Sequence, residues 1–214
     1  MRRNFLSMAA ALLLASGGVR AAAQSVYVKD LAAGKFLVAA RSLDDPNFAQ
    51  TVVLLVRYDE ESVLGLIVNR RSKIPLSRAF PEMSEGHKDR SDPMYFGGPV
   101  ERPVILALVR SAAKPAEAER IFGDVSMISG KKLLDKTLAA GTEPSTFRAY
   151  LGYAGWTRGQ LEGEVELGGW YIFPGDAAAV FEANPEALWP RLILKTEQRI
   201  ALLPRHNLKL RHHL

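Results

Sequence analysis

The stretch LGYAGWTRGQLEGEV, residues 151–165, decides how this sequence is interpreted. It follows TFRAY directly, and residues 146–156 together have the apolar and aromatic content of a strand. Thr157 and Gln160 then have the spacing of a capping box, in which each side chain satisfies a free backbone N–H at a helix start. The stretch therefore predicts a corner between a strand and a helix, with Thr157 as the N-cap.

Most of the remaining residues in this stretch suit the same corner. Trp156 and Leu161 have the spacing of a hydrophobic staple, and Glu162 and Glu164 fall near the positive end of the helix dipole. The corner does not explain Tyr153 or why position 156 is a tryptophan. A binding surface that includes Tyr153, Trp156 and Gln160 is therefore kept as the alternative.

Working outward, apolar runs bounded by turn residues predict further strands. The run TVVLLVRY reads as a buried central strand that forms a hairpin with the next run, and LDDPNF before it reads as a turn. The expected strands are 34–40, 51–58, 63–69, 94–100, 103–109, 146–156 and 168–174.

Helices are expected mainly in the second half of the chain. A short one is expected over 74–83, before a polar loop at 84–93, and a longer one over 130–140 with Ser129 as its cap and Gly141 as its stop. Asp176 is expected to cap a helix over 177–183, and Pro190 to kink or break a last helix that starts at Asn184. Paired strands followed by helices indicate the α+β class.

The first 23 residues read as a cleavable export signal, with cleavage after Ala23. RRNFL, residues 2–6, has the pattern of a twin-arginine signal, and the apolar segment behind it is too short to span a bilayer comfortably. We expect a periplasmic protein with no membrane span after cleavage. An N-terminal signal anchor and a cytoplasmic protein are the alternatives.

The positive charge of the chain sits at its two ends. The net charge is +5, and it is +2 without Arg2, Arg3 and Arg20. The last 24 residues carry +5, which leaves −3 for residues 24–190. We expect one domain over 24–200 and a loose basic tail over 201–214. This distribution argues against nucleic acid as the main partner.

The residues present offer little catalytic chemistry. There is no cysteine, and the four histidines are His87, His206, His212 and His213, of which only His87 precedes the tail region. FGGPV, residues 96–100, lacks the spacing of a nucleotide loop and reads as a tight turn, with anion binding as the alternative. Asp44 and Asp45 beside Pro46 read as turn formers. We expect no catalytic residue, no metal site and no cofactor.

Several of these segments, taken in order, resemble the AlgH/YqgE-like family of bacterial proteins. The matching pieces are GKFLVAA, LDDPNF with TVVLL, GLIVNR, FGGPV, LGYAGWTRGQLEGEV and GGWYIFP, and they cover most of residues 34–174. The resemblance implies an α+β fold with a bent, mixed or mainly antiparallel, barrel-like sheet and helices outside it. It implies no agreed activity, although members are discussed as regulators of exopolysaccharide production.

Two features depart from that family. Its members are usually cytoplasmic, whereas this chain adds an export signal, and LALVR at 106–110 lacks the histidine that often follows the glycine turn. We expect an exported, monomeric binding or regulatory protein with an unknown protein or small-molecule partner. Its candidate surface comprises Asn69, Arg70, Gly97, Gly98, Tyr153, Trp156 and Gln160. The alternatives are an enzyme that uses Asp44, Asn69 or Arg70, and a cytoplasmic regulator of transcription.

Overall fold

The computed structural model describes residues 28–79, 90–157 and 159–202. Its strands are β1 (Lys35–Ala39), β2 (Val52–Tyr58), β3 (Val63–Ile67), β4 (Arg71–Pro75), β5 (Pro93–Phe96), β6 (Val100–Arg110), β7 (Glu119–Phe122), β8 (Val125–Ser129), β9 (Phe147–Trp156) and β10 (Trp170–Pro174). Its helices are α2 (Leu76–Ala79), α3 (Lys131–Ala139), α4 (Gln160–Glu166), α5 (Ala177–Val180), the 3-10 turn η2 (Pro185–Ala187) and α6 (Leu188–Leu202).

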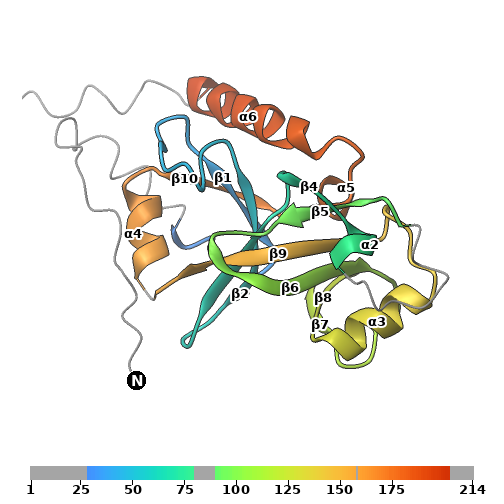
Figure 1. Cartoon of the computed structure of the whole chain (residues 1–214). Helices are drawn as coiled ribbons and strands as arrows, with labels where there is room; N and C mark the ends of the chain where they lie inside the picture. Colours follow the sequence, from blue (N-terminus) through green and yellow to red (C-terminus); the bar gives the residue numbers. More distant parts are fainter. Residues whose placement is uncertain (1–27, 80–89, 158, 203–214) are drawn as a thin grey trace, which may run out of the picture.

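The strands form one mixed, mainly antiparallel sheet in the order β10-β1-β2-β3-β9-β6-β8-β7. Neighbours along this path are antiparallel. Strand β5 pairs with β9 in parallel, and β4 pairs with β5. Figure 1 shows the sheet curling while α4, α3 and α6 stay outside it. The predicted α+β class with a bent sheet is therefore confirmed.

The two ends of the strand order approach each other because the sheet curls. A Cβ built on Gly34, just before β1, would lie 3.0 Å from Cβ of Phe122 at the end of β7. On the neighbouring strand β2, Arg57 donates to Glu119 of β7 at 2.8 Å. Side chains therefore close the half-barrel where backbone pairing stops.

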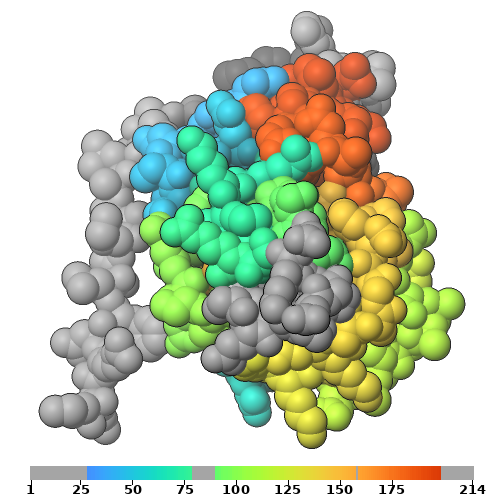
Figure 2. All heavy atoms as spheres, turned by 45° about the vertical axis from the view of Figure 1, so that its right-hand side comes forward, coloured from blue at the N-terminus to red at the C-terminus, as the bar shows by residue number. Residues whose placement is uncertain are grey.

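Two apolar cores lie on opposite faces of the sheet. The larger core joins β1, β2, β3 and β10 to the buried residues of α4, α5 and α6, and β2 is buried from Val52 to Val56. The smaller core joins the C-terminal parts of β6 and β8 and the N-terminal part of β9 to α2 and α3. Figure 2 shows the red residues of α6 beside the blue N-terminal residues, with the yellow residues of α3 at the opposite end.

Successive residues of β9 belong to different cores, because side chains alternate along a strand. Tyr150 lies in the larger core, whereas Ala149 and Leu151 contact the smaller one. Strand β9 therefore lies between the two apolar cores and contributes side chains to both.

Several expected elements are present close to the predicted bounds. The hairpin of β2 and β3 forms, Gly141 follows α3 with φ +79°, and the Asp176 carboxylate accepts the N–H of Ala178 at 2.9 Å as the cap of α5. The hairpin of β7 and β8 and the strand β4 were not predicted. The predicted polar loop at 84–93 lies mostly outside the described residues.

Two helix predictions were wrong in detail. The N-cap of α3 is Gly130, with φ +82°, and not Ser129. Pro190 neither kinks nor breaks the last helix, because α6 begins at Leu188 and the proline falls in its first turn. A backbone N–H has no intrahelical partner in that turn, so proline removes no hydrogen bond there.

Candidate functional site

Gly97 and Gly98 lie where the chain passes tightly against β9. A Cβ at Gly97 would lie 2.2 Å from the carbonyl oxygen of Gly152, and one at Gly98 would lie 2.1 Å from the carbonyl carbon of Tyr153. The Gly97 N–H donates to Leu151 O at 2.9 Å, and Gly97 O accepts from Ile67 at 2.9 Å. Glycine is needed here for close backbone packing against β9.

Asn69 and Arg70 come close to this crossing, but their side chains support the neighbouring loop. Asn69 is only 7% exposed, accepts the N–H of Val52 at 2.8 Å and donates to Gln50 O at 3.0 Å. Arg70 donates to the carbonyls of Asn47 and Ala49 at 2.8 and 3.1 Å. Asn69, a candidate surface residue, is therefore buried, and Arg70 is partly buried.

Burial is the main cause of the pKa shifts of Arg70 and Tyr153. Burial lowers the pKa of the Arg70 guanidinium. Burial, followed by the nearby Glu101 carboxylate, raises the pKa of the half-buried Tyr153 phenol. Tyr153 thus stays protonated at neutral pH and able to donate a hydrogen bond.

Trp156 faces a different group of residues, centred on the Glu164 carboxylate. Glu164 Oε2 accepts from the indole N–H of Trp156 at 3.0 Å and from that of Trp170 at 2.9 Å. Its Oε1 accepts from Gln160 Nε2 at 2.9 Å. Phe48 stacks on Trp156, with ring centroids 5.9 Å apart, and meets Trp170 edge-on at 5.6 Å. These hydrogen bonds and ring contacts hold α4 and the turn at residues 43–48 against the sheet.

The predicted corner from strand to helix is present, but its cap is shifted. The helix α4 begins at Gln160, and its N-cap is Gly159 in the left-handed conformation rather than Thr157. Half of the expected box forms, since the Thr157 N–H donates to Gln160 Oε1 at 3.2 Å. The bonds of Gln160 and Trp156 explain both residues structurally, and Tyr153 remains unexplained.

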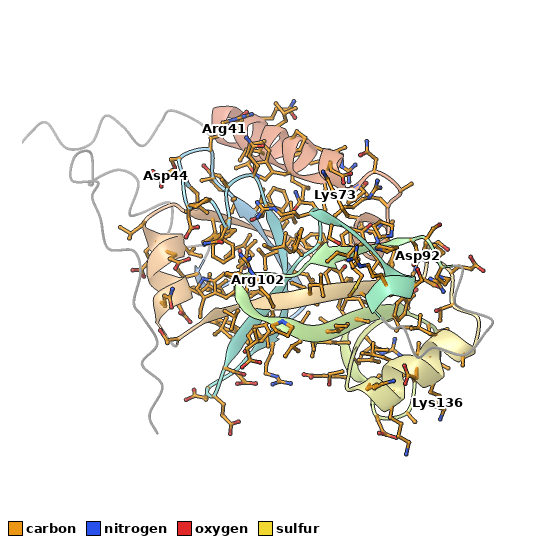
Figure 3. All side chains as sticks on the ribbon, in the orientation of Figure 1. Arg41, Asp44, Lys73, Asp92, Arg102 and Lys136 are labelled. Carbon is orange, nitrogen blue, oxygen red and sulfur yellow. The ribbon has the colours of Figure 1, made fainter. Side chains whose placement is uncertain are left out.

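The predicted surface residues therefore meet only in part. The backbones of 67–70, 96–98 and 151–153 lie together, whereas Trp156 and Gln160 belong to the Glu164 group. Asp44 is exposed, and Figure 3 shows it in the same loop region as Arg41, far from Asp92. Asp45 Oδ1 accepts the N–H of Asn47 at 2.7 Å, as a turn former does.

The sequence reasoning missed a row of apolar side chains across three strands. Phe96 of β5 and Ile105 of β6 are both registered with Leu151 of β9. Phe96 is 39% exposed, and Ile105 and Leu151 are half-buried. We call these three residues the Phe96 row. The adjacent aromatics Tyr95 and Phe96 were a usable signal, because in a strand one of the two must face outward.

Charged side chains border the Phe96 row. Glu101 and Arg102 are exposed in the part of β6 where pairing with β9 is interrupted, between Val100 and Ile105. Figure 3 shows Arg102 near the bend of β6. Within the described ranges, no group of three or more His, Asp or Glu residues could hold a metal ion. His87 and the three tail histidines lie outside them.

The fold and the corner at 151–165 define an AlgH-like protein. The model of that family matches residues 36–201, so the chain belongs to the AlgH-like family. Among relatives of the UPF0301 type, a protein from Azoarcus sp. is 34% identical over 154 residues, which cover 71% of this chain and 81% of that one. One from Chlorobium luteolum is 34% identical over 166 residues, covering 77% and 86%.

Two solved structures share the fold. The solution structure of AlgH from Pseudomonas aeruginosa has a TM-score of 0.63 and 31% identity, and the match covers 88% of this chain and 96% of that one. A crystal structure from Corynebacterium diphtheriae has a TM-score of 0.64 and 24% identity, covering 77% and 87%. The predicted family resemblance is confirmed.

Proposed function

We propose that this AlgH-like protein is exported and acts as a binding protein for another protein, without catalysing a reaction. The observation that carries the proposal is the Phe96 row. It places the exposed Phe96 beside the half-buried Ile105 and Leu151, with the exposed Glu101 and Arg102 at its border. An apolar centre with a charged rim is the usual composition of a protein–protein interface.

The candidate polar residues support binding rather than chemistry. Asn69 and Arg70 direct their hydrogen bonds at main-chain carbonyls and an N–H of residues 47–52, so they shape a loop. Glu164 accepts three hydrogen bonds from fixed side chains. A general base must lie within hydrogen-bond distance of the substrate proton, and these side chains already make hydrogen bonds within the protein.

Among the described residues, none of the helices has the length and apolar content of a membrane span.

Site-specific photo-crosslinking in the native host tests the binding surface. A benzoylphenylalanine introduced in place of Phe96 should give a discrete crosslinked product, and one in place of Leu194, which is also exposed, should not. The captured partner should then bind the purified protein, and Phe96→Ser should weaken binding by about tenfold or more. A product formed only with a second copy of this chain, or binding unchanged by the substitution, would contradict the proposal.

Export is tested separately through the N-terminal arginines. Replacing Arg2 and Arg3 with Lys should keep the precursor in the cytoplasm, and the mature parent should begin near Gln24 in the periplasm. Unchanged export of the double variant would refute the twin-arginine route. A parent chain found only in the cytoplasm would favour the intracellular regulator instead.

A further inference from the structure

The guanidinium of Arg148 is buried without an ionic partner. Arg148 lies on β9, is 5% exposed and donates through Nη2 to the main-chain oxygen of Glu182. Its Nη1 is inaccessible and has no hydrogen-bond partner, and no carboxylate of the described residues pairs with it. A buried charge that lacks a counter-charge is costly and calls for an explanation.

Two tyrosines complete the surroundings of this guanidinium. The Tyr95 ring lies beneath it, 4.6 Å from Cζ to the centroid, and Tyr95 and Tyr150 are cross-strand partners with rings 5.5 Å apart. The Tyr150 hydroxyl is buried and also has no partner. Burial raises the pKa of Tyr150, so the phenol keeps its proton and can donate. The unpartnered Arg148 Nη1 and Tyr150 hydroxyl therefore lie on the same side of β9, and the covering segment holds one buried unpartnered acceptor, Glu182 Oε1.

We propose that Arg148 and Tyr150, with the Tyr95 ring beneath the guanidinium, form a binding site for one carboxylate group. Arg148 Nη1 offers two N–H groups and Tyr150 offers one O–H, beside a single positive charge. A carboxylate brings two acceptor oxygens and one negative charge, which matches both the donors and the charge. A phosphate dianion would bring a second negative charge and a third oxygen that these donors do not satisfy.

The segment Phe181–Asn184, between α5 and η2, covers the site. The carbonyls of Glu182 and Ala183 accept from Arg148 and Arg71, and the Glu182 carboxylate pairs with Arg191 at 2.8 Å. Because the free donor atoms are inaccessible in this arrangement, binding requires the segment to move before a ligand can reach Arg148 Nη1 and the Tyr150 hydroxyl. The exposed positions of Ala183 and Asn184 put the outer side of the segment in solvent.

This site is independent of the Phe96 row. Tyr95 and Phe96, like Tyr150 and Leu151, are successive strand residues and face opposite sides of the sheet. Loss of carboxylate binding therefore leaves the proposed protein interface unchanged. A negative result for one proposal does not decide the other.

Titration of the purified protein with sodium acetate, at ionic strength held constant with sodium chloride, tests the site. The side-chain ¹⁵N signals of arginine should show saturable shifts for Arg148. Tyr150→Phe should weaken binding by about tenfold and Arg148→Met should abolish it. The control Arg110→Met, which removes an exposed arginine paired with Asp124, should leave the affinity unchanged. If Arg148→Met does not fold, Tyr150→Phe decides.

Other outcomes overturn the proposal. No saturation by acetate, equal affinity of Tyr150→Phe and the parent, or saturation by inorganic phosphate in place of acetate would each refute it. So would a crystal structure grown with acetate in which an ordered water joins Arg148 to Tyr150. A parallel titration with acetyl-alanyl-alanine and its amide separates the two sources of carboxylate. Tighter binding of the free acid than of acetate would identify a peptide C-terminus as the ligand.

Discussion

At the scale of single residues, Asn69 shows how a polar side chain substitutes for a missing strand neighbour. Its amide bonds both to the N–H of Val52 and to Gln50 O, at the point where β2 begins. Asn69→Ala should lower the free energy of unfolding by about 2 kcal/mol, because it leaves these groups unsatisfied in a buried position. Urea denaturation measures this loss. Stability equal to that of the parent would show that water replaces the amide.

The Asp59 carboxylate gives a prediction on pH. It accepts from the N–H groups of Ser62 and Glu61 in the turn between β2 and β3, and these bonds, Ser62 first, lower its pKa. The folded carboxyl thus has a lower pKa than the unfolded one, so its contribution is complete above about pH 4 and is lost as pH falls through the folded pKa. Asp59→Asn should therefore lose less stability between pH 6 and pH 3 than the parent. Parallel pH profiles in denaturation would contradict this.

At the scale of elements, α4 is held by its buried Leu161 and Val165 and by the Glu164 carboxylate. Glu164→Ala removes the acceptor of both indole N–H groups and should cost about 2 kcal/mol or more. Glu164→Gln keeps an acceptor oxygen and should recover a part of that loss. Thermal unfolding followed by tryptophan fluorescence measures both variants and reports the environment of the indoles. A Glu164→Ala variant as stable as the parent would mean that the carboxylate does not hold the helix.

Several elements encoded by neighbouring residues were predicted well, whereas the local caps expected at Ser129 and Thr157 were not. The apolar run of β2, the turn behind it, Gly141 and the Asp176 cap all depend on contacts within a few residues. The burial of Asn69 and the Phe96 row depend on which strands become neighbours, and β5 beside β9 beside β6 is not a local property. The β7–β8 hairpin had a local signal in its Gly-Asp turn at 123–124, and that signal was overlooked.

At the scale of the whole molecule, the half-barrel is closed by Phe122. This side chain packs against Gly34 and Gly175, at the two turns beside β1 and β10. Phe122→Ala should cost about 2 kcal/mol, less than a fully buried phenylalanine, because the ring is half-buried. Chemical denaturation measures it, with Phe96→Ala as a surface control of small effect. A loss no larger than the control would mean that the two ends of the sheet are independent.

The central place of β9 has a consequence for translation. Its partners β3, β5 and β6 are all made earlier, and none of them is next to another in the strand order without β9 between them. Until residue 156 leaves the ribosome, these strands have unpaired edges and uncovered apolar faces. The nascent chain is thus open to capture by chaperones through most of its synthesis, and β1–β3 and β6–β8 can join into one sheet only after β9 is made.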